Sequence, residues 1–122
     1  MDKQEIKKLQ IRNSTVDFLV FTKDSGESGI EVRVQDGTVW LTQKGLSQLF
    51  DADRSVITKH LKNIYTADEL DEKATCAKFA QVADNGRTYQ YLFYSLPAII
   101  SVGYRINSER AVQFRQWATK IL

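Results

Sequence analysis

The hydrophobic and polar positions of the chain first follow a strand period and then a helix period. Residues 14–22, STVDFLVFT, are rich in β-branched and aromatic side chains, which predicts a strand. Residues 30–42, IEVRVQDGTVWLT, alternate apolar and polar positions before Asp36-Gly37, a dipeptide that accepts the positive φ of a tight turn. These two segments predict three antiparallel strands. The buried face of the hairpin is expected to carry Ile30, Val32 and Val34.

Two short helical patterns follow this hairpin, and a three-residue acidic turn separates them. Thr42 can cap a helix over residues 43–50 by accepting a hydrogen bond from its first turn. Residues 51–53, DAD, form the turn, and Asp53 can cap the second helix, which begins at Arg54. On this second helix the apolar side chains fall on one side, and lysines and hydroxyls fall on the other. The inward side is expected to hold Val56, Ile57, His60, Leu61 and Ile64.

A second hairpin is predicted after the acidic linker TADELDE. Residues 75–82 and residues 88–94 form its arms, with Asn85-Gly86 as the turn signal between them. The second arm, TYQYLFY, is unusually aromatic. Its tyrosines can stack on bases, or they can pack at the rim of the core, as alternation on a strand favours.

Two closing helices complete the pattern. Residues 96–106, LPAIISVGYRI, form a helix in which Pro97 is tolerated because the first amides have no helical partner. Ser108 can cap a last helix over residues 109–122. The apolar stripe of that helix is Ala111, Phe114, Ala118 and Ile121.

The order of these elements predicts one α+β domain over residues 1–122, a winged helix-turn-helix-like arrangement of two β-hairpins and C-terminal helices. Hydrophobic residues make up 43% of the chain and charged residues 26%, which is typical of a globular protein. The sequence stops in the middle of an apolar pattern, at Ile121-Leu122, without a glycine cap. We therefore expect a fragment of a longer protein.

The distribution of charge is more informative than the net value of +2. Residues 54–65 hold three cations and no acid, whereas residues 68–72 hold four acids. A locally basic face suits a polyanionic partner such as nucleic acid. Helix pairs with a basic outer face also occur in proteins that bind no DNA, so both interpretations remain open at this point.

Several classes of function are disfavoured. The charged start MDKQEIKKLQIR is unlike a signal peptide and no apolar run approaches a membrane span, so we expect a cytoplasmic protein without membrane contact. A single cysteine, Cys76, cannot form an internal disulfide, and together with one histidine, His60, it cannot assemble a zinc site without several carboxylates. We expect both side chains in or beside the core. No glycine-rich phosphate loop or nucleophile motif is present, which predicts neither enzymatic activity nor a cofactor.

Residues 41–65, LTQKGLSQLFDADRSVITKHLKNIY, supply the parts of a helix-turn-helix, whose second helix enters the major groove. The turn usually opens with glycine. Asp51 holds that position here, and aspartate tolerates a left-handed conformation better than most residues.

Roles in DNA binding follow from the chemistry of the side chains. Arg54 can clamp a guanine edge or a phosphate, and the residues after it project toward base edges or the flanking backbone. The start of the first helix can bind phosphate, and the second hairpin can act as a wing. The predicted DNA-binding residues are Gln43, Lys44, Arg54, Ser55, Thr58, Lys59, Lys62, Asn63, Lys78 and Arg87.

Three long blocks resemble the bacterial virulence-protein RhuM family, and the resemblance extends back to about residue 16 through IEVRVQDGTVWLTQKGLSQLF. The blocks are DRSVITKHLKNIY, ELDEKATCAKFAQV and YSLPAIISVGYRINSERAVQFRQWATKIL. The order of elements is also similar to the Bro-N domain of phage and viral antirepressors. The resemblance implies a cytoplasmic protein of mobile or pathogenicity-island DNA, with a DNA-binding N-terminal domain.

Two functions are carried forward. The first is binding of double-stranded DNA through residues 54–63 with support from the second hairpin. The alternative is an interaction module without direct DNA binding, in which residues 98–122 pair with a second copy or with a repressor protein. Salt dependence separates them, because phosphate contacts weaken steeply as salt rises whereas apolar association does not.

Overall fold

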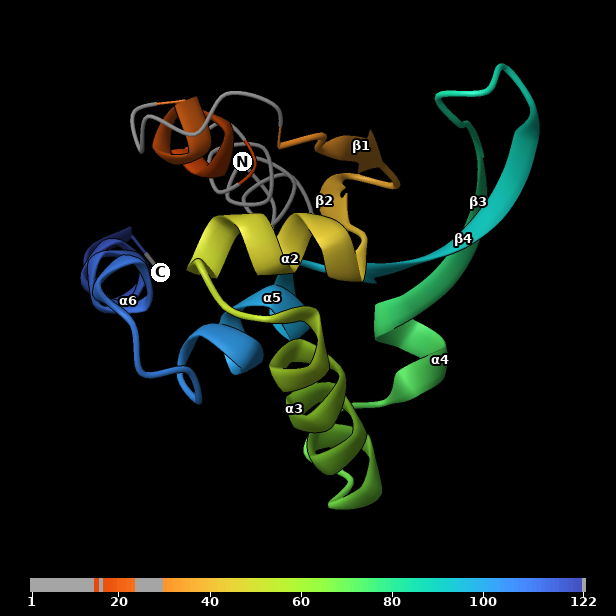
Figure 1. The fold of residues 1–122 in the computed structure, drawn as a ribbon. Coiled ribbons are helices and arrows are strands. Elements are labelled where there is room, and N and C mark those ends of the chain that lie inside the picture. Colours follow the sequence, from red (N-terminus) through yellow and green to blue (C-terminus); the bar gives the residue numbers. More distant parts are fainter. Residues whose placement is uncertain (1–14, 16, 24–29, 122) are drawn as a thin grey trace, which may run out of the picture.

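The computed structural model describes Thr15, residues 17–23 and residues 30–121, and these residues form a mixed α+β fold (Figure 1). An antiparallel sheet of four strands runs in the order β1-β2-β4-β3. The elements are β1 (Arg33–Gln35), β2 (Thr38–Leu41), α2 (Gln43–Phe50), α3 (Arg54–Thr66), α4 (Glu72–Thr75), β3 (Cys76–Val82), β4 (Thr88–Ser95), α5 (Leu96–Gly103) and α6 (Glu109–Ile121). The α+β class is as predicted.

The strand predicted over residues 14–22 is wrong. Thr15 and residues 17–23 are helical, and Ser14 and Val16 lie outside the described residues. Phe18 is fully buried, and the rings of Phe18 and Phe21 lie 5.9 and 5.3 Å from that of Trp117. Helical spacing puts both phenylalanines on one face, so contacts with α6 outweigh the strand preference of the segment.

The first hairpin is confirmed, but one side chain of its predicted buried face is misplaced. Asp36 and Gly37 have φ values of 55° and 77°, as the turn requires. Val34 is 55% exposed, whereas its neighbour Arg33 is half-buried with its guanidinium carbon 4.4 Å from the ring centroid of Phe79. The curl of the sheet brings aromatic side chains of β3 and β4 to the Arg33 face, and the long arginine side chain packs on them.

The second hairpin is also confirmed, and it joins the first in one sheet. Its register runs from Cys76 opposite Tyr94 to Val82 opposite Thr88. The turn is closed at Asn85, whose side-chain oxygen accepts a 2.9 Å hydrogen bond from the amide of Arg87. Strand β4 continues past the hairpin to pair with β2. A short helix, α4, begins at Glu72, the last residue of the predicted acidic linker, and it includes Thr75, which was predicted as the first residue of the hairpin arm.

The closing helices pack around one glycine. A Cβ atom on Gly103 would lie 2.5 Å from a ring carbon of Phe114, so only glycine permits this approach of α5 to α6. Helix α5 ends there, three residues before the predicted end at Ile106. Ser108 caps α6 as predicted, accepting a 3.1 Å hydrogen bond from the amide of Ala111. The predicted stripe is buried at Ala111, Phe114 and Ala118.

Candidate nucleic-acid interface

Helices α2 and α3 are held together by apolar side chains that the sequence spaces at helical intervals. Thr42 caps α2 as predicted, with its hydroxyl accepting a 3.1 Å hydrogen bond from the amide of Gly45. Leu46 and Phe50 of α2 are fully buried, as is Ile57 of α3. Leu61 and Ile64 extend the same cluster along α3. Val56, which was expected on the inward side, is 38% exposed, because α3 turns only a narrow stripe toward the core.

The turn between the helices is built on Asp51 and Ser47. Asp51 has a φ of 50°, the left-handed conformation expected at this position, and its amide donates to the carbonyl of Ser47. The hydroxyl of Ser47 donates a 2.6 Å hydrogen bond to the carbonyl of Ala52. Asp53 is the N-cap of α3 as predicted, although its side chain makes no capping bond. These local bonds fix the angle at which α3 leaves α2.

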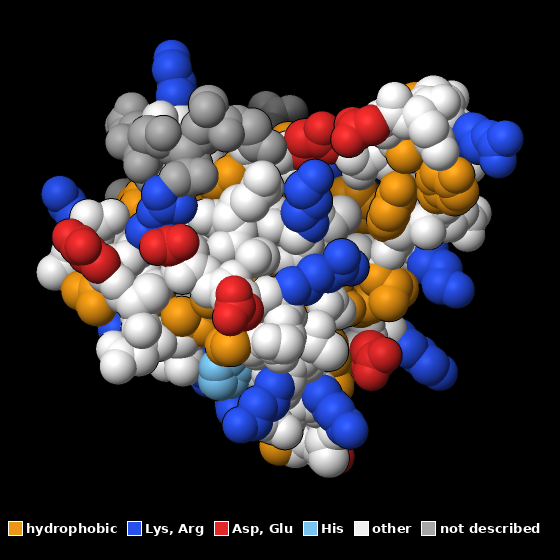
Figure 2. All heavy atoms as spheres, in the orientation of Figure 1, with side chains coloured by type: hydrophobic (Ala, Val, Ile, Leu, Met, Phe, Trp, Pro, Cys, Tyr) orange, Lys and Arg blue, Asp and Glu red, His pale blue; other side chains and the backbone are white. Residues whose placement is uncertain are grey.

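The outer face of α3 is open to solvent. We use this name for Arg54, Ser55, Thr58, Lys59, Lys62 and Asn63, all of which are exposed. Helix α3 projects from one end of the molecule, and the space-filling view shows Lys and Arg side chains on both sides of it (Figures 1 and 2). Acids lie beyond both ends of the helix, and residues 54–66 contain none. The outer face is therefore bare and cationic, as a groove-reading helix requires.

His60 adds no positive charge to this surface. It is half-buried beside the outer face, and burial lowers its pKa below the usual 6.5, with Arg105 and Lys59 acting in the same direction. The imidazole is therefore neutral at pH 7, and the charge of α3 comes from its arginine and lysines.

Gln43 and Lys44 occupy different environments, although both begin α2. Lys44 is exposed. Gln43 is half-buried, and its amide oxygen accepts a 2.6 Å hydrogen bond from the hydroxyl of Thr58. Its amide nitrogen donates to the Tyr94 hydroxyl at 3.2 Å. Gln43 thus joins α2, α3 and β4, and both ends of its amide are engaged within the protein.

The two predicted wing residues are exposed at separate places on the hairpin. Arg87 follows the turn at the tip. Lys78 lies opposite Leu92 in the register, whereas Phe79 lies opposite Tyr91. Because side chains alternate along strands, Lys78 and Tyr91 are on opposite faces of the hairpin. The structure therefore gathers eight of the ten predicted residues on α2 and α3 and leaves Lys78 and Arg87 on the hairpin.

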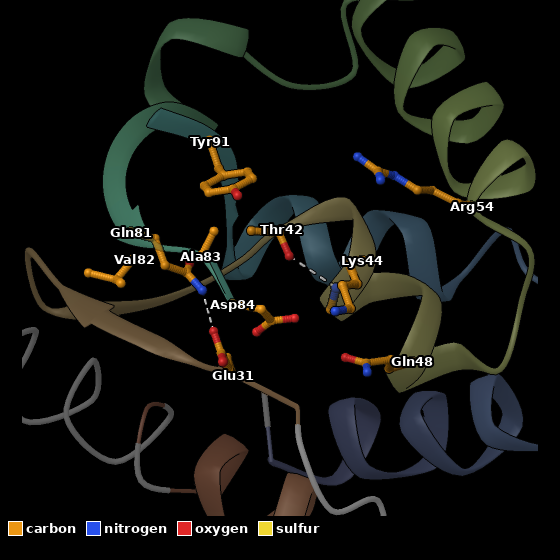
Figure 3. Close-up of a pocket in the computed structure, with 11 residues that line it drawn as sticks. Glu31, Thr42, Lys44, Gln48, Arg54, Gln81, Val82, Ala83, Asp84 and Tyr91 are labelled. Carbon is orange, nitrogen blue, oxygen red and sulfur yellow. Dashed lines mark hydrogen bonds between the residues drawn. The ribbon is translucent and has the colours of Figure 1, made fainter. Parts of the chain in front are cut away.

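A cleft of about 200 Å³ separates the two helices from the hairpin (Figure 3). Lys44 and Gln48 of α2 and Arg54 of α3 lie on one side of it. Residues of the hairpin, including Gln81, Asp84 and Tyr91, line the other side, and Glu31 completes the lining. Sequence patterns did not identify Glu31, Gln48, Gln81, Asp84 or Tyr91 as site residues, because the cleft exists only through the curl of the sheet.

Tyr94, which is the partner of Gln43, and Cys76, which lies opposite Tyr94 in the sheet, both have raised pKa values. Burial raises the pKa of the Tyr94 hydroxyl, so this group stays protonated and accepts the hydrogen bond from Gln43. Burial likewise raises the pKa of the Cys76 thiol. Cys76 is therefore a half-buried neutral thiol, in agreement with its predicted packing role.

Comparison with known proteins gives one result. Over residues 74–122 the chain matches the Virulence protein RhuM family. This RhuM match confirms the resemblance for α4 in part, the β3–β4 hairpin, α5 and α6, and leaves α2 and α3 outside the matched region. No curated protein and no solved structure matches the chain. The similarity to Bro-N domains and the extension of the resemblance to residue 16 remain predictions.

None of the described helices is both long enough and apolar enough to cross a membrane. No group of three His, Cys, Asp or Glu side chains gathers as metal ligands in the described part of the chain.

Proposed function

We propose that the protein binds double-stranded DNA, with α2 and α3 as a helix-turn-helix and the β3–β4 hairpin as its wing. The observation that carries this proposal is the bare cationic outer face of α3. The helix has 13 residues and is therefore about 20 Å long. A B-DNA major groove is about 12 Å wide and admits an α-helix. Arg54, Lys59 and Lys62 are the cations that face the duplex.

The turn and core support this role because they fix α3 while using only Thr58 of its outer face. The apolar side of the helix is buried in the core through Ile57, Leu61 and Ile64. Gln43 holds Thr58 from the α2 side. The remaining side chains of the outer face are free of the sheet, so a duplex can approach them without any rearrangement of the protein.

The alternative, an interaction module built on residues 98–122, has less support. Ala111, Phe114 and Ala118 are buried within this chain, so the apolar stripe of α6 is already used. Arg115 donates to the carbonyls of Gly103 and Ile106 at 2.9 and 2.8 Å, which ties another long side chain of α6 to the domain itself. Pairing of two copies through α6 would need a different surface of that helix.

A mobility-shift titration with random-sequence duplex at low and moderate salt tests the proposal. We expect Lys59→Glu/Lys62→Glu to abolish binding while the melting temperature stays unchanged, because both side chains are exposed. Lys73→Glu/Lys120→Glu makes the same change of charge on exposed residues of α4 and α6 and serves as the control. Equal loss of binding in both double variants would mean that only net charge matters and would remove α3 from the interface.

A further inference from the structure

The cleft between the helices and the hairpin contains two cations that make no ion pair with any described residue. They are Lys44, on α2, and Arg54, at the start of α3 (Figure 3). The only ion pair between described residues joins Arg105 to Glu69, on other elements. Tyr91 presents its ring from the hairpin side of the cleft. The cleft therefore combines unpaired positive charge on one wall with an exposed aromatic ring on the other.

The hairpin wall of the cleft is fixed in place by the opposite edge of the sheet. Arg33 of β1 donates from Nη1 to the carbonyl of Ala80 on β3 at 3.2 Å. Its guanidinium also covers the ring of Phe79, which packs edge-on against Trp40 with 5.2 Å between centroids. Gln81 donates to the carboxylate of Glu31. These contacts hold β3 against the first hairpin, so the cleft is preformed.

The geometry of B-DNA determines what would occupy this cleft once α3 lies in the major groove. One sugar-phosphate strand separates each major groove from the adjacent minor groove. A helix in the major groove and a hairpin on its flank therefore have that strand between them. The cleft lies on this path, since the hairpin forms one wall, and α2 with Arg54, the first residue of α3, forms the other.

We infer that one sugar-phosphate strand of the bound duplex runs through this cleft, with Lys44 and Arg54 on its phosphates and Tyr91 against a deoxyribose. The inference rests on the proposed function. In this arrangement the hairpin forms one wall of the channel that holds the DNA strand, in addition to the contacts predicted for Lys78 and Arg87. Contacts of this kind position a protein on the duplex without reading sequence.

Two carboxylates also line the cleft, so the inference predicts whether removing one of their charges raises or lowers the affinity for duplex. Glu31 is held by Gln81 at the edge of the cleft. Asp84 is exposed and lies within the cleft, between the hairpin and the side chains of Lys44 and Gln48 (Figure 3). A carboxylate beside a phosphate strand opposes binding through like-charge repulsion. Removing the charge of Asp84 therefore strengthens binding more than the same change at a distant carboxylate only if the strand passes here.

The first arm of the experiment compares Asp84→Asn with Glu109→Gln by duplex titration at about 0.1 M salt, where the Debye length is about 10 Å. Glu109 is exposed and belongs to α6, a helix that lies on the other side of the molecule from the hairpin in Figure 1, and its substitution makes the same change of charge. We expect Asp84→Asn to tighten the dissociation constant about fivefold. The control should change it by at most about twofold, because salt screens distant charges. Thermal melting of both variants verifies the fold.

The second arm examines Lys44 by the salt dependence of duplex binding. Lys44→Gln should lower the slope of log affinity against log salt by about 0.9, because one phosphate contact is lost, whereas Lys120→Gln on α6 should leave the slope unchanged. If wild type binds duplex but Asp84→Asn and Lys44→Gln behave like their controls, the strand does not use the cleft and the role of α3 stands. If wild type binds no duplex, the proposed function fails and this inference with it.

Discussion

The hydroxyl of Thr58 donates a 2.6 Å hydrogen bond to the side-chain oxygen of Gln43, which links the outer face of α3 to α2. Gln43 passes the connection to β4, since its nitrogen donates to the Tyr94 hydroxyl at 3.2 Å. Thr58 is also 3.0 Å from the carbonyl of Arg54, the acceptor left to it if Gln43 is lost. The orientation of the proposed reading helix therefore depends on a polar chain as well as on apolar packing.

Thr58→Val removes the donor of this chain and keeps the shape of the side chain. We expect the free energy of unfolding to fall by about 0.5–1.5 kcal/mol, because the half-buried oxygen of Gln43 loses its partner. Thr58→Ser retains a hydroxyl and is the matched control. Urea denaturation measures both. A Thr58→Val variant as stable as wild type, beside a destabilised Thr58→Ser variant, would show that the methyl group, and not the hydrogen bond, supports the helix.

Asp51 adopts a left-handed conformation with a φ of 50°, in the turn between α2 and α3. Asp51→Gly and Asp51→Ala both remove the carboxylate, so their difference isolates the backbone. We expect the alanine variant to be less stable than the glycine variant by about 1 kcal/mol, since only glycine adopts this conformation without steric cost. Thermal unfolding of the pair measures the difference. An alanine variant at least as stable as the glycine variant would contradict a strained turn.

Gly103 leaves no room for a side chain between α5 and α6. The added methyl group of Gly103→Ala would lie 2.5 Å from one ring carbon of Phe114 and 3.0 Å from Phe50. We expect a loss of about 1–3 kcal/mol in the free energy of unfolding, because the rings or the helices must shift. Ser101→Ala, a substitution at a half-buried position of the same helix, is the control. A variant as stable as this control would mean that the two helices separate at little cost.

The Tyr65 hydroxyl provides a prediction about pH. Burial raises its pKa from 10.0 to about 12, and its hydrogen bond with Thr75 opposes this shift. The folded state thus holds the proton more tightly than the unfolded state does, so stability present below pH 10 is lost as the pH rises toward 12. We expect Tyr65→Phe to lose stability less steeply than wild type over that window. Denaturant melts at several alkaline pH values test this, and parallel curves would refute the raised pKa.

Much of the fold near the proposed interface could be predicted because its signals are local. Thr42, Asp51 and Asp53 occupy the cap and turn positions that the sequence indicated. The two hairpin turns, at Asp36-Gly37 and Asn85-Gly86, were marked by residues that accept positive φ. The exposure of Lys59 and Lys62 followed from the helical period alone.

Other features were not predictable because distant residues decide them. The helix over residues 17–23 has the composition of a strand. It is helical because Phe18 and Phe21 pack on Trp117, almost a hundred positions away in the chain. Arg33, and not the predicted Val34, lies on the buried side of β1 because its guanidinium packs on Phe79. Phe79 reaches β1 only because the sheet curls.

By itself, the sequence determined the helix pair, its turn and the polarity of α3, since caps, turn residues and hydrophobic period act over a few positions. Tertiary structure alone decided that Gln43 faces Tyr94, 51 positions away, and that the hairpin stands opposite Lys44 and Arg54 to form a cleft. The physical reason is that a cleft is a relation between surfaces. Its walls come together through the curl of the sheet and the hydrogen bond from Arg33 to the carbonyl of Ala80, which no local pattern encodes.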